Sequence, residues 1–172
     1  MTPAARTAAT IELLALVETT PRPADATVSR YFRDRRFIGS KDRAQIADLV
    51  YRLMRRRARL GWWIERSGAE MTPRTLVLAD LLLGGAETAT ADKLFSGGQY
   101  APAALDRGAQ ALAKRLAGHT FFHPEMPDAV AAECPPWAEA ELRAALGSRF
   151  AAEMAALEEP APLDLRINPL KT

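Results

Sequence analysis

Residues 40–61 read SKDRAQIADLVYRLMRRRARLG, and both the apolar and the basic residues of this stretch recur with the period of an α-helix. Ser40 is a residue type that caps helix N-termini, and Gly61 is a type that ends helices. The apolar residues fall on one side of the helix: Ile46, Leu49, Val50, Leu53, Met54 and Leu60. The stretch therefore predicts one long helix that buries a single face.

The basic residues of this stretch gather on the opposite side. Four of them stand at i, i+3, i+4 and i+7: Arg52, Arg55, Arg56 and Arg59. We expect their guanidinium groups to form a ladder along the side of the helix that is open to water. Arg57 instead projects on the apolar side. Because a buried and unpaired arginine is too costly, we expect either a bend near Arg57 or a partner carboxylate.

Basic residues are concentrated in one part of the chain. The whole sequence carries 23 Lys and Arg against 21 Asp and Glu, a net charge of +2. Between residues 30 and 66 there are 12 basic and 4 acidic residues, a local charge of +8 that leaves −6 for the remainder. Such segregation favours a polyanionic partner such as nucleic acid, although a plain solvated face has the same composition.

The composition indicates a soluble all-α protein. A chain of 172 residues suits one domain, or one domain with a piece of another, and its abundant alanine and leucine favour helices. Cys134 is the only cysteine, which precludes an internal disulfide and suits a reducing cytoplasm. No stretch resembles a signal peptide or a membrane span, so we expect a cytoplasmic protein without membrane association.

Caps, breakers and apolar spacing predict further helices on both sides of the central stretch. They are expected over residues 3–20, 23–35, 73–83, 90–95 and 102–116, with one or two extra turns over 62–68 and a jointed pair over 136–157. The helix over 73–83 is apolar nearly all round, as a central buried element would be. Residues 118–136 hold four prolines and are expected to form a loop.

The tail of the chain changes character. Residues 160–172, PAPLDLRINPLKT, alternate apolar with polar side chains, which is typical of a strand. A single strand has no partner to pair with in a helical chain. We therefore expect this segment to open another domain.

No combination of residues indicates catalysis or metal binding. One group has metal-ligating residue types: His119, His123, Glu125 and Cys134. A glycine and a proline flank its H-x-x-x-H spacing and there is no second cysteine, so we expect two loop histidines and a structural thiol. The prolines that follow Cys134 favour a structural turn over a nucleophile. The Gly-Gly pairs match no phosphate-binding loop.

Trp62 and Trp63 lie next to the predicted arginine ladder, just after Gly61. Aromatic side chains beside arginines can stack on nucleobases, but tryptophans are more often part of a core. We expect at least one of the two to be structural.

Four stretches together resemble the start of an RsmB-type, Sun-related RNA cytosine-C5 methyltransferase. They are AARTAATIELLALV (4–17), FIGSKDRAQIADLVYRLMRRRARLGWWI (37–64), CPPW (134–137) and APLDLRINPLKT (161–172). The resemblance implies a NusB-like, all-α RNA-binding domain over residues 1–134 and linker helices over 135–159. Residues 160–172 would then begin an RNA-binding subdomain that precedes the S-adenosylmethionine-binding domain.

The resemblance also implies which parts are missing. The two catalytic cysteines and the cofactor loop of the family lie in the later methyltransferase domain, and nothing in residues 1–172 matches them. Cys134 is therefore not expected to be catalytic. We expect an N-terminal, non-catalytic part of a longer enzyme that itself uses S-adenosylmethionine, with no cofactor and no metal in this part.

The expected partners are ribosomal RNA and the chain's own C-terminal methyltransferase domain. Phosphate contacts are expected from the ladder and from the basic residues before it. The predicted RNA-binding residues are Arg33, Arg35, Arg36, Lys41, Arg43, Arg52, Arg55, Arg56 and Arg59.

Two other functions fit the same residues. A NusB-like antitermination adaptor, or a scaffold that packs on the methyltransferase domain, would pair its arginines with an acidic protein surface. A helix-turn-helix DNA binder is a weaker interpretation, because no short recognition helix with a tight turn stands out.

Overall fold

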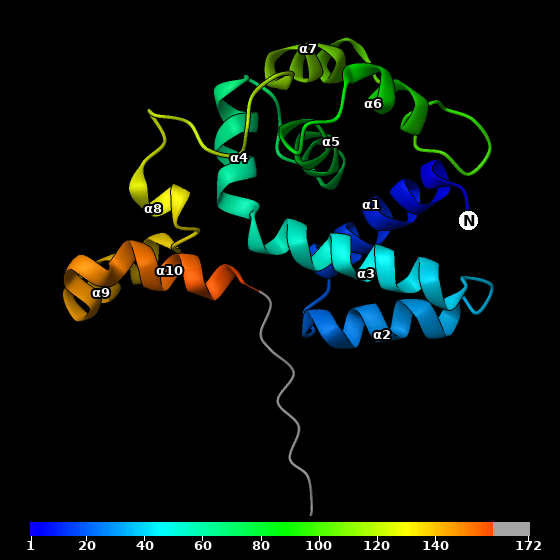
Figure 1. Ribbon diagram of the computed structural model, residues 1–172. Coiled ribbons are helices and arrows are strands. Elements are labelled where there is room, and N and C mark those ends of the chain that lie inside the picture. Colours follow the sequence, from blue (N-terminus) through cyan, green and yellow to red (C-terminus); the bar gives the residue numbers. More distant parts are fainter. Residues whose placement is uncertain (160–172) are drawn as a thin grey trace, which may run out of the picture.

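The computed structural model describes residues 1–159, which are helical and contain no strand (Figure 1). This confirms the predicted all-α class for the described part. The helices are α1 (Pro3–Thr19), α2 (Ala24–Asp34), α3 (Ser40–Arg55), α4 (Arg57–Arg66), α5 (Pro73–Leu83), α6 (Thr88–Leu94), α7 (Arg107–Leu116), α8 (Asp128–Ala131), α9 (Pro136–Leu146), the 3₁₀ turn η1 (Gly147–Arg149) and α10 (Phe150–Glu158). The strand predicted over 160–172 lies outside the described residues.

Helix α5 is the centre of the bundle, as its apolar sequence predicts. It contacts α1, α3, α4, α6 and α7, and the side chains of Leu78 and Ala79 are fully buried. Its start is set locally by a capping box in which the Thr72 hydroxyl accepts from the Thr75 N–H and the Thr75 hydroxyl accepts from the Thr72 N–H. None of the helices among residues 1–159 is long and apolar enough to cross a membrane.

The central stretch is not one helix. Arg56 has φ −104° and ψ 18°, outside the helical region, and the chain turns there from α3 into α4 (Figure 1). The bend predicted near Arg57 is therefore confirmed. The alternative, a partner carboxylate, is also present, because the Arg57 guanidinium pairs with Glu18 of α1.

Two end signals predicted for this stretch are wrong. The N-cap position is taken by Gly39, so Ser40 is the first helical residue. Gly61 does not end a helix but lies buried inside α4, where an added Cβ would stand 3.0 Å from the Met71 Sδ atom. The glycine is explained by this close approach of a side chain, which periodicity along one helix does not reveal.

The remaining helices agree with the sequence except at two places. The helix expected over 102–116 begins only at Arg107, because Asp106 caps it by accepting from the Ala109 N–H at 2.8 Å. The expected loop over 118–136 contains the short helix α8. The joint expected in the final pair occurs at Gly147, whose φ of +54° ends α9.

The C-terminal helices pack around a small core of their own. Cys134, Phe150 and Met154 form this second cluster, separate from the main core of α1 to α7. Helix α8 contacts α4, so the two clusters are joined along one side of α4. The boundary at residue 134 between a NusB-like domain and linker helices stays a prediction.

We predict that Leu78→Ala lowers the free energy of unfolding by about 2–5 kcal/mol, because the side chain is fully buried at the centre of the bundle and its removal leaves a cavity. Leu157→Ala is the matched control. Its side chain is 73% exposed, so we expect a change below about 0.5 kcal/mol. Urea unfolding followed by circular dichroism measures both values, and equal losses would contradict the central position of α5.

Candidate nucleic-acid interface

The predicted arginine ladder is not an exposed row. The Arg52 Nη2 atom lies 3.1 Å from Asp80 Oδ2, and the Arg56 Nη1 atom lies 3.4 Å from Asp80 Oδ1. Asp80 belongs to α5 and is only 6% exposed. One buried carboxylate therefore holds two of the four guanidinium groups and ties the end of α3 to α5.

Arg59 is buried even more deeply, at 3% exposure. Its Nε donates to Glu133 Oε1 at 2.8 Å, and its Nη2 pairs with Glu158 of α10. After the break at Arg56, Arg59 meets carboxylates of the C-terminal segment, whereas Arg52 before the break meets Asp80 of α5. The expectation of a water-exposed ladder that includes Arg59 is therefore wrong.

Glu133 also caps the start of α4. Its carboxylate accepts from the Ala58 N–H at 2.7 Å and from the Arg59 N–H at 3.1 Å, which are free donors at the new helix N-terminus. Glu133 itself has φ +50°, a left-handed conformation that is rare outside glycine. Burial raises the pKa of its carboxyl, against the hydrogen bonds from Arg59 and from the two amides, which lower it.

A different group of basic residues is free. Arg33, Arg36 and Lys41 lie where α2 ends and α3 begins, are exposed, and have no carboxylate partner among residues 1–159. We call these three residues the α2–α3 corner. Arg55, near the far end of α3, is also exposed and without a carboxylate partner in the described part.

The two other predicted residues of this region are engaged within the fold. Arg35 pairs with Glu12, and its guanidinium carbon lies 3.9 Å from the centre of the Tyr31 ring. Arg43 donates from Nε to the Ile38 carbonyl at 2.7 Å and from Nη2 to the Arg36 carbonyl at 3.3 Å. Both stabilise the corner rather than present free cations.

At least one tryptophan is structural, as predicted. Trp63 is buried and its Nε1–H donates to the Phe121 carbonyl at 3.3 Å. His119 and His123 pack against this ring, with centroids 4.9 and 5.3 Å away. No three His, Cys, Asp or Glu side chains within residues 1–159 gather closely enough to hold a metal ion.

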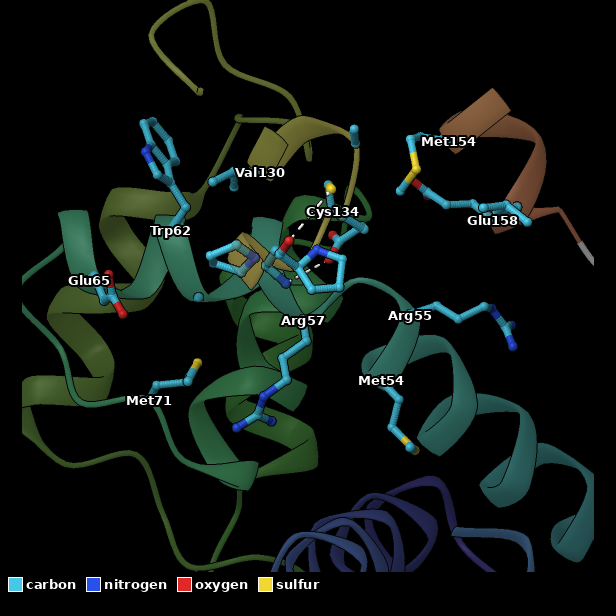
Figure 2. Close-up of a pocket in the computed structure, with 17 residues that line it drawn as sticks. Met54, Arg55, Arg57, Trp62, Glu65, Met71, Val130, Cys134, Met154 and Glu158 are labelled. Atoms are coloured by element: carbon cyan, nitrogen blue, oxygen red, sulfur yellow. Dashed lines mark hydrogen bonds between the residues drawn. The ribbon is translucent and has the colours of Figure 1, made fainter. Parts of the chain in front are cut away.

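A groove of about 660 Å³ lies between α4 and the C-terminal helices (Figure 2). Figure 2 shows Trp62 on the α4 side and Met154 on α10, with Cys134 between them. The Cys134 thiol is buried and lies 3.7 Å from the Pro135 carbonyl oxygen, in agreement with a structural turn. Sequence reasoning missed this groove because residues 54–71 and 130–158 form it together.

Compared with known protein families, curated proteins and solved structures, the chain shows no match. The features that bear on function are therefore those of the chain itself. They are the free cations of the α2–α3 corner and the apolar groove beside α4.

We predict that Glu133→Ala lowers the free energy of unfolding by about 3–5 kcal/mol, because it leaves Arg59 buried with one partner fewer and α4 without its cap. Thermal or urea unfolding measures this loss.

Glu153→Ala is the control for that variant. Its carboxylate pairs with Arg149 on an exposed helix face, where removal of the partner costs less than about 0.5 kcal/mol. A Glu133→Ala protein as stable as the control would show that the buried pair does not hold α4 in place.

Proposed function

We propose that this chain is an RNA-binding domain, and that it docks ribosomal RNA by phosphate contacts from the α2–α3 corner. It would act as the N-terminal part of an S-adenosylmethionine-dependent RNA cytosine-C5 methyltransferase and would not catalyse methyl transfer itself. The observation that carries the proposal is the set of exposed cations Arg33, Arg36 and Lys41, which have no carboxylate partner within residues 1–159.

The electrostatics of the corner support a polyanion as the ligand. A guanidinium or ammonium group that already has an intramolecular carboxylate gains little from a phosphate, whereas a free one releases counterions when it binds. The neighbouring Arg30 meets Asp34 only at 3.7 Å, on an exposed helix face. Residues 30–43 hold six basic and two acidic residues, so the corner keeps a local positive charge.

The sequence resemblance supports the same region. The corner begins just before the resembling stretch 37–64, and Lys41 belongs to the SKDR segment of that stretch. Phosphate contacts position a nucleic acid without reading its sequence, so the choice of nucleotide would rest with the methyltransferase domain.

We predict that the triple variant Arg33→Gln, Arg36→Gln, Lys41→Gln binds single-stranded RNA about tenfold more weakly at low salt. The slope of log K against log salt concentration, which is negative, should become less steep by about 2, since each lost phosphate contact removes about 0.7 from its magnitude. Fluorescence anisotropy with a labelled RNA oligonucleotide at several salt concentrations measures both quantities.

Arg55→Gln is the control for a free cation outside the corner. Arg55 is also exposed, but it lies 14 residues along α3 from Lys41, about 21 Å away. We expect less than a twofold change in affinity and an unchanged slope. If the triple variant behaves like this control, the corner does not bind RNA.

The reading frame beyond Thr172 tests the second half of the proposal. We expect a prolyl-cysteine motif and then a second cysteine motif, the catalytic pair of the family that the sequence resembles. A stop codon in their place would favour the adaptor.

The groove beside α4 favours one alternative, a NusB-like adaptor or scaffold that binds protein. Met54 and Met71 line this groove and are partly exposed, and Leu157 on its C-terminal side is 73% exposed. A protein of this kind would show no RNA affinity above that of a neutral control protein, which the same anisotropy measurement decides.

A further inference from the structure

Phe37 is held out into solvent at the turn between α2 and α3. The Ile38 N–H donates to the Arg35 carbonyl at 3.1 Å, which closes a turn with Arg36 and Phe37 at its tip. Ile38 is buried and Arg43 binds the carbonyls on both sides of Phe37, so the turn is fixed. The Phe37 side chain nevertheless remains 79% exposed.

Tyr100 is a second aromatic residue held out, and its backbone is strained. The Ala101 N–H donates to the Gly98 carbonyl at 3.0 Å, which closes a turn whose third residue is Tyr100. Tyr100 has φ +64°, a conformation that such turns normally give to glycine or asparagine. The ring is 76% exposed, so packing does not explain why a tyrosine stands at this strained position.

Both aromatic residues line one pocket of about 650 Å³. Its lining residues come from α1, from α2 with the turn that follows it, and from the loop that carries Tyr100. Tyr31 and Ile38 are buried residues of its lining, and Gln99 adds a side-chain amide that can donate and accept hydrogen bonds. A pocket of this size, mostly apolar with a few polar groups, suits a flat heterocycle.

The charges around this pocket do not repel a nucleotide. Among the described residues, Glu12 is the only carboxylate in the lining, and it is paired with Arg35 and accepts from the Tyr31 hydroxyl at 2.8 Å. Burial raises the pKa of Tyr31, and the hydrogen bond to Glu12 raises it further, so the hydroxyl stays a donor to that carboxylate. Outside the pocket, Arg36 is the direct neighbour of Phe37 and belongs to the α2–α3 corner.

We propose that this pocket binds an unpaired nucleobase of single-stranded RNA, stacked against Phe37 and Tyr100, while the α2–α3 corner contacts the adjoining phosphates. This inference rests on the proposed RNA-binding function and adds a preference for single strands. In a duplex the bases are already stacked, so they cannot enter a pocket of this kind without unpairing.

The test uses a short single-stranded RNA that carries 2-aminopurine, a base whose fluorescence falls on stacking, and a duplex of the same length. We expect the complete chain to quench the fluorescence and to bind the single strand more tightly than the duplex. Phe37→Ala should weaken single-strand binding about 5- to 150-fold and leave duplex binding unchanged. Phe37→Trp should restore the single-strand affinity.

Tyr100→Asn separates a binding role from a structural one. Asparagine tolerates the positive φ of this position, so the variant should unfold at a temperature equal to or higher than that of the wild type. Its affinity for the single strand should nevertheless fall, with reduced quenching. Trp137→Ala, which removes an equally exposed ring from α9, is the control and should change neither measurement.

The two proposals fail separately. If Phe37→Ala and Tyr100→Asn bind the single strand like the wild type, while the triple corner variant binds weakly, the base pocket is wrong and phosphate docking stands. Equal binding of single strand and duplex without quenching leads to the same conclusion. If the triple variant also binds like the wild type, both the proposed RNA-binding function and the proposed base-binding pocket are wrong. An apolar protein segment would then be the better ligand for the pocket of Phe37 and Tyr100.

Discussion

The arrangement of this protein depends on the contacts that the Glu133 carboxylate makes at the start of α4. The break at Arg56 frees the first N–H groups of α4, and Glu133 satisfies two of them while it binds the Arg59 guanidinium. Because α4 packs on α5 and α8, this one group joins the helix bundle to the C-terminal helices. The strained backbone of Glu133 is tolerated because the carboxylate has these partners.

Ion pairs within the fold separate the predicted RNA-binding arginines that have a carboxylate partner from those that have none among residues 1–159. Asp80 pairs with Arg52 and Arg56, whose side chains stay partly exposed, and Glu133 and Glu158 pair with the buried Arg59. The pairs of Arg59 are costly to break by removal of one member, although buried pairs add little net stability when formed. Arg33, Arg36 and Lys41 of the α2–α3 corner have no such partner in the described part of the chain, so they are available to a polyanion as a group of three close in sequence.

Local signals in the sequence predicted most of the helices. Thr72 and Pro73 at the start of α5, and Gly147 at the joint of the final pair, act through contacts within a few residues, which a sequence displays directly. The sequence also displays every basic residue, so the free corner cations were among the predicted RNA-binding residues. It did not distinguish them from Arg59, which is buried and paired in the structure. The pocket of Phe37 and Tyr100 left no signal, since its walls meet only in the folded chain.

The sequence by itself determined that the described chain is helical, where most helices begin and end, and that positive charge is concentrated over residues 30–66. Only the tertiary structure decided which of those charges remain free. The physical reason is distance along the chain: Asp80 lies 28 residues from Arg52, and Glu133 and Glu158 lie 74 and 99 residues from Arg59. The 3.6-residue period places a side chain on a face of its helix but does not say which carboxylate that face will meet.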